Sequence, residues 1–309
     1  MSDEARANGP ILCLGEAIVD LVSEAELASP SEADSFRPHF GGALANVAVS
    51  AARHGARVAL AGGVGDDEWG EWLRRRLERE GVDLRWFSLI AGLQTPIAFV
   101  TFDQGREPTF AVYGDGIDAG MHSLQGSLES AVAASSALVF GSNTLVGAPE
   151  RELTLRAREL ALERDIPVVF DPNIRPNRWG DLERAHELCR AAAAGAFVVR
   201  ANVEEARSLG GLEPGAGVAE GAEALCALGA RVAVVTAGPE GGVARGEARA
   251  DAPAEEVEVV SPLGAGDAFL GALAAGAARR GWTAQGVADS LPEAIAAGTR
   301  ACRGWGAVP

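Results

Sequence analysis

The sequence predicts an α/β sandwich whose central sheet is mostly parallel and covered by helices on both faces. Six short apolar runs are continuous rather than alternating, which is typical of strands buried on both sides. Longer amphipathic stretches lie between these runs, so strands and helices alternate along the chain. The expected strands span residues 11–15, 57–63, 137–141, 166–171, 196–199 and 231–236.

The stretch 67–80, "DEWGEWLRRRLERE", shows the pattern of the expected helices. Apolar residues recur at helical spacing on one face, while arginines and glutamates occupy the other. A helix of this kind covers a sheet with its apolar face. The residues of that face are Trp69, Trp72, Leu73 and Leu77.

Two segments, residues 17–40 and 96–113, interrupt the alternation. The second reads as two strands joined by a turn at Gln104 and Gly105. Both segments flank a glycine-rich stretch, so we interpret them as a small β-sheet lid. Surface hairpins without a role are the alternative interpretation. The lid strands are expected within about residues 16–40 and 95–115.

Length and composition predict one globular domain over residues 1–309, since no low-complexity linker or internal repeat divides the chain. Hydrophobic residues make up 48% and charged residues 23%, which is ordinary for a protein with a packed core. The net charge of -16 and the pI near 4.7 argue against nucleic acid or an anionic membrane as partner.

The chain contains no lysine, and all 27 basic residues are arginine. This excludes Schiff-base chemistry and a P-loop lysine. An anion bound by this protein would therefore be held by arginine, by backbone N–H groups or by a metal ion.

The four cysteines are far apart and form no CxxC pair, so we expect buried free thiols rather than a zinc or redox site. The first ten residues are polar, and no later run approaches the roughly 18 apolar residues of a membrane span. These features predict a cytoplasmic protein.

Residues 261–273, "SPLGAGDAFLGAL", place one carboxylate where a small-residue turn becomes a helix. Backbone N–H groups of Gly264, Ala265 and Gly266 can converge there as an anion site without obstruction by side chains. Asp267 would repel that anion unless it takes a proton from an attacking hydroxyl, and phosphoryl transfer needs this combination. The alternative is that Asp267 is an N-cap and the glycines form a tight turn.

A second glycine-rich stretch precedes an expected helix. Gly41 and Gly42 allow a close approach of the backbone to a small ligand, and Asn46 offers both a donor and an acceptor to hydroxyl groups. Neutral, polyhydroxylated substrates need such mixed groups. An ordinary turn followed by a capped helix is the alternative.

These two stretches resemble the two signatures of the ribokinase-like (PfkB) family of carbohydrate kinases. They read "GGALANVAVSAARHGARVALAGGVGDDEWGEWL" and "GAGDAFLGAL", in the family's order and spacing. The segments "ILCLGEAIVDLV", "VVFDPNIRPNRW" and "VVRANVEEA" are most similar to bacterial fructokinases and 2-keto-3-deoxygluconate kinases. The resemblance implies a ribokinase-like three-layer α/β/α sandwich with a small lid, and an ATP-dependent sugar kinase that uses Mg²⁺.

The resemblance also implies roles for individual residues. Asp267 matches the base that deprotonates the sugar hydroxyl, and Gly264, Ala265 and Gly266 match the anion hole. Arg175 matches an arginine that reaches the phosphates or the substrate. The positions that match sugar-binding residues are Asp20, Gly41, Gly42 and Asn46.

Other matching positions concern the nucleotide. Asn202 and Glu205 match the family's NxxE element, which helps to position magnesium and the nucleotide phosphates, so Glu205 would act on the metal indirectly. Thr236, Gly238 and Gly241 match the loop that runs along the nucleotide.

The sequence departs from the family pattern at two places. Ser261 and Pro262 stand where relatives carry Asp-Thr, which removes a carboxylate from the monovalent-cation site. Gly114 follows Tyr113 where sugar-acid kinases and fructokinases usually carry arginine, and this favours a neutral sugar.

Three functions are consistent with these features. A fructokinase-like enzyme is the principal hypothesis, and a 2-keto-3-deoxygluconate kinase or another ribokinase-like sugar or nucleoside kinase is the first alternative. The other is a catalytically weak protein that binds sugar or nucleotide. The partners would be a small-molecule sugar and a nucleotide, and a homodimer could form through apolar lid residues, namely Ile97, Phe99, Phe110 and Val112.

Overall fold

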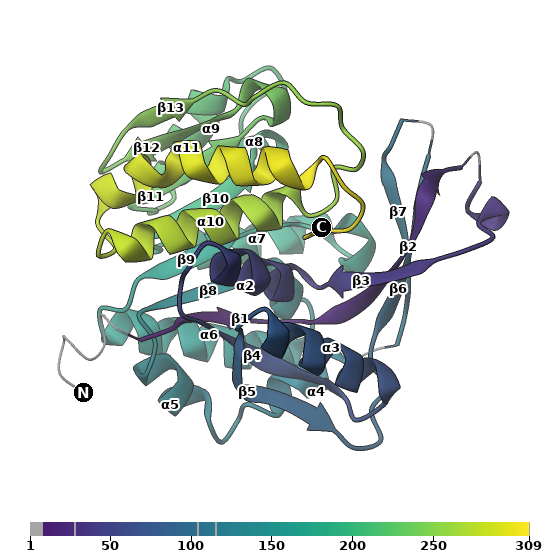
Figure 1. The fold of residues 1–309 in the computed structure, drawn as a ribbon. Helices are drawn as coiled ribbons and strands as arrows, with labels where there is room; N and C mark the ends of the chain where they lie inside the picture. The colour runs from purple at the N-terminus through teal and green to yellow at the C-terminus, as the bar shows by residue number, and fades with distance from the viewer. Residues whose placement is uncertain (1–8, 28, 104, 115, 309) are drawn as a thin grey trace.

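The computed structural model describes residues 9–27, 29–103, 105–114 and 116–308 (Figure 1). Within them, a nine-stranded sheet forms the centre of the molecule. Its neighbouring strands pair in parallel from β11 to β5, and only β12 and β13 run antiparallel to their neighbours. The strands in spatial order are β13 (Ala250–Ala252), β12 (Gly242–Gly246), β11 (Val232–Thr236), β10 (Val198–Asn202), β9 (Val168–Asp171), β8 (Ala137–Gly141), β1 (Ile11–Leu14), β4 (Val58–Gly65) and β5 (Asp83–Ile90).

Successive side chains of a central strand enter two separate hydrophobic cores. In β1, Ile11 and Cys13 belong to one core, whereas Leu12 and Leu14 belong to the other. Both faces therefore need apolar residues, which explains why these strands read as continuous apolar runs. The predicted three-layer sandwich with a mostly parallel sheet is confirmed.

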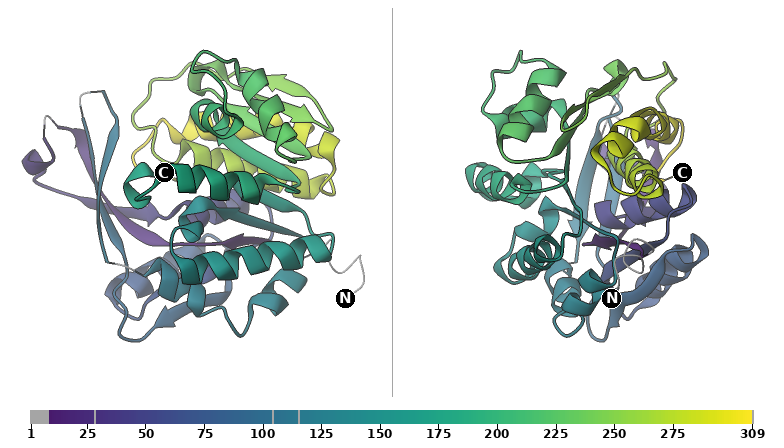
Figure 2. Two further views of the ribbon diagram at one scale, coloured as in Figure 1. Left: turned by 180° about the vertical axis from the view of Figure 1, so that it is seen from behind. Right: turned by 90° about the vertical axis from the view of Figure 1, so that its left-hand side faces the viewer.

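Helices cover both faces of the central sheet (Figure 2, right). One face carries α2 (Ala43–Arg53), α3 (Glu68–Arg79), α10 (Ala265–Arg279) and α11 (Ala284–Ala301). The other carries α4 (Ile117–His122), α5 (Leu128–Ala133), α6 (Ala148–Glu163), α7 (Leu182–Ala193), α8 (Val203–Gly210) and α9 (Val218–Ala227). Short 3₁₀ turns occur at η1 (Pro30–Glu32), η2 (Ser142–Leu145), η3 (Pro176–Arg178) and η4 (Gly238–Glu240).

A smaller four-stranded sheet, in the described part of the chain, projects from one end of the sandwich (Figure 1). This is the second sheet that the interrupted segments predict, although Gln104 of the expected turn lies outside the described residues. Its strands in spatial order are β3 (Arg37–Gly41), β2 (Ile18–Glu26), β6 (Ile97–Phe102) and β7 (Pro108–Tyr113).

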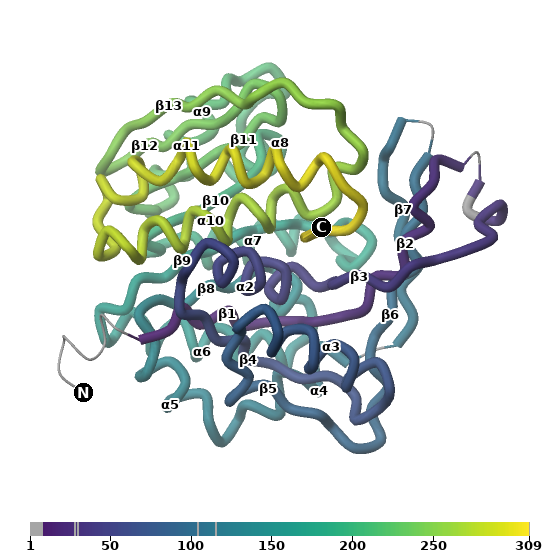
Figure 3. The backbone as a smooth tube through the Cα atoms, in the orientation of Figure 1, coloured from purple at the N-terminus to yellow at the C-terminus, as the bar shows by residue number. Residues whose placement is uncertain are grey.

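Residues 305–308, near the C-terminus (Figure 3), pack between the small sheet and the turn that precedes α10. Trp305 packs on Phe102 of β6, with ring centroids 5.0 Å apart. Ala307 shares a small apolar cluster with Leu263, just before α10, and with β6.

Three strands of the central sheet were not predicted from the sequence, namely β5, β12 and β13. β5 lies at the edge of the sheet, pairs only with β4, and carries Asp83 and Arg85, so it lacks a continuous apolar run. β12 and β13 consist mostly of glycine, alanine and charged residues, and their pairing in register with β11 compensates for low strand propensity.

In the described residues, no helix combines the length and apolar character that a membrane crossing requires. All four cysteines are free; Cys13 and Cys189 are buried, whereas Cys226 and Cys302 are only half-buried. The expectation of free thiols is confirmed. That of full burial is wrong for Cys226, in the last turn of α9, and for Cys302, which follows the last residue of α11.

The contact between α2 and α10 is unusually close because both helices present small residues. A Cβ atom added to Gly271 of α10 would lie 2.5 Å from the Cβ of Ser50 and 2.6 Å from the carbonyl oxygen of Val47. The Ser50 hydroxyl also donates to the carbonyl oxygen of Ala268 at 2.8 Å. This contact fixes the distance between the N-terminal turns of the two helices.

We predict that Gly271→Val lowers the free energy of unfolding by about 1–3 kcal/mol, because the side chain must push α2 away from α10. Urea denaturation measures the change. Gly126→Val is the control, since a Cβ there meets no atom within 4 Å, and it should stay within about 0.5 kcal/mol of the parent. Equal losses in both variants would contradict the close packing.

Candidate active site

A cavity of about 540 Å³ lies at the carboxyl edge of the central sheet, beneath the small sheet. Chain segments that follow β1, β8 and β9 line it together with the end of β10, and β2, β6 and β7 of the small sheet contribute as well. Parallel strands place their carboxyl ends at one edge, so residues far apart in sequence meet there. The predicted site residues that line this cavity are Asp20, Gly42, Asn46, Arg175, Asn202, Gly264, Gly266 and Asp267.

The turn before α10 has the geometry of an anion site. Gly264 adopts a left-handed conformation, with φ of 72°, and the helix begins at Ala265. A Cβ on Gly264 would lie 2.3 Å from the Cα of Ala307, and one on Gly266 would lie 2.7 Å from Nη1 of Arg200. Gly264 is therefore required sterically, whereas a side chain at Gly266 would displace the Arg200 guanidinium. The N–H of Ala265 donates to the carbonyl oxygen of Pro262 at 3.2 Å, and the next N–H groups of the helix have no intrahelical partner.

Asp267 is the third residue of α10 and does not cap it, so the interpretation as an N-cap is wrong. Its side chain is buried, and its Oδ2 accepts a hydrogen bond of 2.9 Å from Nδ2 of Asn46. Burial raises the pKa of Asp267 to about 6, although the Asn46 hydrogen bond and the charge of Arg175 oppose this rise. A carboxylate with this pKa can accept a proton near neutral pH.

Asp20 and Gly42 line the cavity, and Gly41 lies against the side chain of Asp20. A Cβ on Gly41 would lie 2.3 Å from Oδ1 of Asp20, so this glycine supports Asp20 from behind rather than lining the cavity. Gly42 has φ of 85° and leaves no room for a side chain beside the backbone of Glu16. Burial, and then the charge of Asp267, hold the pKa of Asp20 well above its usual range.

Glu16 and Asn143 were missed by the sequence analysis. Oε1 of Glu16 accepts hydrogen bonds from the N–H of Ala43 at 3.1 Å and from Nδ2 of Asn143 at 2.8 Å. Both side chains contribute to the cavity lining. The only sequence signal was the position of each residue just after a buried strand.

Several acceptor atoms around the cavity have no hydrogen-bond partner among the described residues. Buried polar atoms in folded proteins are normally paired, and bound ligands or water supply the partner when the protein does not. A ligand that donates several hydrogen bonds would satisfy these atoms. The unpaired acceptors are Glu16 Oε2, Asp20 Oδ1, Asn46 Oδ1 and Asn143 Oδ1.

Arg200, also missed by the sequence analysis, bridges the ends of three neighbouring strands. From β10, its Nη1 donates to Oδ2 of Asp171 on β9 at 3.1 Å, and its Nη2 donates to Oγ1 of Thr236 on β11 at 3.0 Å. Arg175, by contrast, is exposed in the loop after β9.

Asn202 and Glu205 form a capping box at the start of α8. Oδ1 of Asn202 accepts from the N–H of Glu205 at 2.9 Å, and Oε2 of Glu205 accepts from the N–H of Asn202 at 3.1 Å. Oε1 of Glu205 accepts from the N–H of Ile174 at 2.8 Å. Glu205 therefore holds the loop that carries Arg175, and both of its oxygens are engaged.

The predicted nucleotide loop lies outside the main cavity. Gly241, with φ of 87°, lines a separate cavity of about 320 Å³ beside β12 and β13. Gly238 has φ of 55° and open space where a Cβ would lie. Thr236 is linked to the main cavity by its hydrogen bond to Arg200. Gly238 and Gly241 do not line the cavity that contains Asp267.

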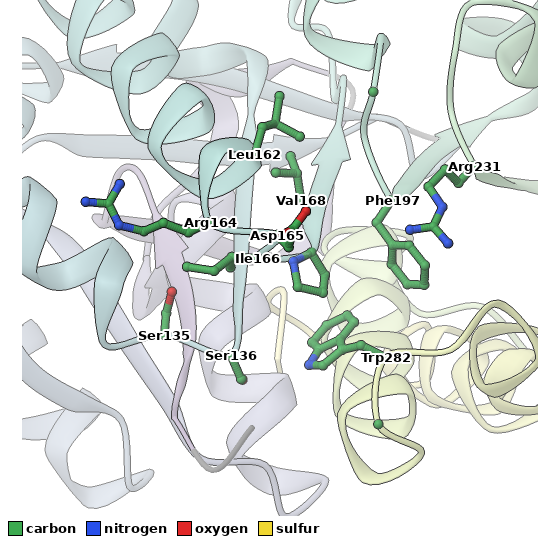
Figure 4. Close-up of a pocket in the computed structure, with 13 residues that line it drawn as sticks. Ser135, Ser136, Leu162, Arg164, Asp165, Ile166, Val168, Phe197, Arg231 and Trp282 are labelled. Atoms are coloured by element: carbon green, nitrogen blue, oxygen red, sulfur yellow. The ribbon is translucent and has the colours of Figure 1, made fainter. Parts of the chain in front are cut away.

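A larger cavity, of about 720 Å³, lies at the opposite edge of the sheet, where β8 to β11 begin (Figure 4). Arg231 lines it but pairs with Glu247 at 2.8 Å and lies over the ring of Phe197. Arg164 in turn pairs with Glu129. Both arginines of this cavity are thus paired with carboxylates, and the unpaired acceptors described above lie at the other edge of the sheet.

The chain matches known proteins over most of its length. The model of the pfkB family of carbohydrate kinases covers residues 9–303. A fructokinase from Klebsiella pneumoniae is 34% identical over 294 residues, which cover 92% of this chain and 88% of the relative.

Solved structures show the same architecture. A fructokinase double mutant from Vibrio cholerae O395, with fructose, ADP and a potassium ion bound, superposes with a TM-score of 0.81 at 26% identity, covering 97% of this chain and 94% of that one. A fructokinase with bound ATP from Xylella fastidiosa has a TM-score of 0.81 at 25% identity, with the same coverage.

The raised pKa of Asp267 predicts a stability cost at neutral pH. The folded state binds the proton more tightly than the unfolded state, so the stability that this group contributes is present below pH 3.8 and is lost as the pH rises through about 6. Asp267→Asn should therefore raise the free energy of unfolding by about 3 kcal/mol at pH 8, and by much less at pH 4.

The control is Asp67→Asn. Burial raises the pKa of Asp67, but hydrogen bonds from Thr95 and Gly70 outweigh it and lower the pKa overall. Asp67→Asn should therefore lower the free energy of unfolding at pH 8, whereas Asp267→Asn should raise it. Chemical denaturation at both pH values measures the two effects. Equal stability of Asp267→Asn and the parent at pH 8 would contradict the assigned pKa.

Proposed function

The chain belongs to the pfkB family of carbohydrate kinases, and we propose that it is a fructokinase that transfers the γ-phosphoryl group of ATP to a hydroxymethyl group of fructose. The observation that carries this proposal is the buried Asp267 carboxylate, which lies beside the anion turn at the head of α10. Proton acceptor and anion site are thus adjacent, as in-line phosphoryl transfer requires.

Different residues of the cavity would accept the proton and bind the phosphoryl group. Asp267 takes the proton of the attacking hydroxymethyl group, and the hydrogen bond from Asn46 fixes the orientation of its carboxylate. The N–H groups of the turn at Gly264, Ala265 and Gly266 receive the transferred phosphoryl group. Negative charge that develops there also meets the positive end of the α10 dipole.

The unpaired acceptors support a substrate rich in hydroxyl groups. Asp20, Asn46 and Glu16 each present a buried oxygen without a partner among the described residues. Sugar hydroxyls would donate to these oxygens, and Gly42 allows the sugar to approach the backbone closely. Gly41 contributes indirectly, because only a residue without a side chain leaves room for the Asp20 carboxyl group.

The nucleotide is proposed to lie over β10 and β11. Asn202 and Glu205 shape the loop beside its phosphates, while Thr236, Gly238 and Gly241 line its path. Arg175 is exposed at the cavity wall, where it can reach the phosphates or the sugar.

Magnesium fits this site as a companion of the nucleotide. In the described residues, no group of three or more His, Cys, Asp or Glu side chains forms a ready cation site, and both oxygens of Glu205 are engaged with backbone N–H groups. Mg²⁺ usually keeps several waters and binds mainly through substrate phosphates. When bound, it would offset phosphate charge, with Glu205 acting on it only indirectly.

A homodimer through the small sheets is the proposed assembly. The edge strand β7 exposes Val112 and Tyr113, at 46% and 64% of their full surface. An open sheet edge with apolar side chains favours pairing with a second copy.

Phosphorylation of a sugar acid, 2-keto-3-deoxygluconate, is the second candidate, because Arg175 and Arg178 line the cavity and could pair with a carboxylate. Gly114 argues against it, since it has φ of 89° and supplies no side chain where an arginine would bind the acid.

We predict a higher kcat/KM for fructose than for 2-keto-3-deoxygluconate, by about 10² or more, because an unpaired carboxylate is costly to bury. A panel of sugars assayed for ADP release measures this preference. Asp267→Asn is the control and should lose at least about 10²-fold in turnover while retaining ATP binding. A measured preference for the sugar acid, or full turnover by Asp267→Asn, would refute the corresponding assignment.

We also predict that activity depends little on potassium. Ser261 is buried, and its hydroxyl oxygen already accepts a hydrogen bond of 3.1 Å from the N–H of Leu263. A neutral, occupied hydroxyl attracts a cation far less than a carboxylate does. Values of kcat/KM in potassium, sodium and tetramethylammonium at equal ionic strength should be nearly the same. Strong activation by potassium alone would show that backbone carbonyl groups suffice.

A further inference from the structure

Arg200 is the one basic side chain that is buried in the described part of the chain, with 7% of its surface exposed. Its guanidinium group lies between Asp171 on β9 and Thr236 on β11, at hydrogen-bond distance from both. The ring of Phe269 from α10 lies 5.5 Å from the guanidinium carbon. Three strands and one helix thus hold this cation in a single orientation.

The guanidinium group also contacts the anion turn. A Cβ on Gly266 would come within 2.7 Å of Nη1 and 3.1 Å of Nη2, so the turn lies directly against the cation. Nε of Arg200 has no partner among the described residues. Because guanidinium carries five N–H donors, some of them remain for an oxygen bound at the turn.

The charges around the turn make a buried cation necessary. Asp267 lies in the first turn of α10, and Asp171 is paired with Arg200 beside Gly266, so each would repel a phosphate at the turn when it is ionised. Burial alone would lower the pKa of Arg200, but the charges of Asp171 and Glu205 outweigh it and raise the pKa above its ordinary value. The guanidinium group therefore stays positive.

On the basis of the proposed phosphoryl transfer, we propose that Arg200 is a positioning residue for that reaction. Its fixed positive charge holds Asp171 and the Gly266 turn in place and lowers the electrostatic cost of bringing phosphate to the turn. Arg175, the cation expected from the sequence, is exposed, so water and salt screen its charge more strongly than that of Arg200.

The first test compares Arg200→Met, Arg200→Lys and a matched control. Arg231→Met is that control, because Arg231 is also ion-paired and also lies over a phenylalanine ring, but at the opposite edge of the sheet. We expect Arg200→Met to lower kcat/KM for ATP by about 10²-fold, Arg200→Lys to recover part of it, and Arg231→Met to match the parent. Parental activity of Arg200→Met would overturn the proposal.

The double variant Arg200→Met with Asp171→Asn separates positioning from simple stabilisation. Removing one partner of a buried ion pair can prevent folding, whereas removing both charges leaves a neutral pair. If Arg200 only stabilises the fold, the double variant should be as active as Asp171→Asn alone. The proposal predicts at least about ten-fold lower kcat/KM than Asp171→Asn, with thermal unfolding at a comparable temperature.

The pH profile gives a readout that a purely structural role would not move. Asp267 faces Asp20 on β2, Asp171 on β9, Arg200 on β10 and Arg175 in the loop after β9. Since Arg200 lowers the pKa of Asp267, the acidic limb of kcat/KM should move to higher pH in Arg200→Met and stay in place in Arg200→Lys. An unmoved limb in Arg200→Met would overturn the proposal.

Failure of this inference is distinguishable from failure of the proposed function. Calorimetry with ATP alone needs no sugar turnover, and it should show weaker binding to Arg200→Met than to the parent and to Arg231→Met. If the parent binds ATP but phosphorylates no sugar, the proposed function fails while this comparison still decides the role of Arg200. Equal ATP affinity of all three proteins would overturn the inference.

Discussion

The site depends on one hydrogen bond, which joins Asn46 in the first turn of α2 to Asp267 in the first turn of α10. These residues are 221 positions apart in the chain, and the packing of Gly271 on Ser50 brings their helices together. Both helix N-termini therefore point toward one cavity, so their dipoles favour negative charge there. The Asp267 carboxylate, which we propose as the proton acceptor, is therefore held where the two helices meet.

The polar groups around this cavity lower the free energy of unfolding of the ligand-free protein. Buried acceptors without donors and carboxylates with raised pKa values cost free energy in the absence of a ligand, and here they cluster around one cavity. The hydrophobic clusters on both faces of the sheet offset this cost. A ligand rich in hydroxyl groups would remove part of it by pairing with the acceptors.

Much of the fold was predictable because a strand buried on both faces must be apolar throughout, as in β1 and β8. β5, β12 and β13 escaped prediction because edge position and antiparallel pairing relax that requirement. In the site, Gly264, Gly266 and Asp267 were recognisable since their chemistry is local to one turn. Glu16, Asn143 and Arg200 were not, because their hydrogen-bond partners are far away in the sequence and each is a single polar residue in or just after an apolar run.

Residues 305–308 contribute to the site although they do not line its cavity. Trp305 and Ala307 lie between the small sheet and the anion turn, where Ala307 abuts Gly264. The shape of the cavity therefore depends on this segment as well as on α2 and α10. A substitution at Ala307 would displace the turn that carries Gly264 without replacing any residue that lines the cavity.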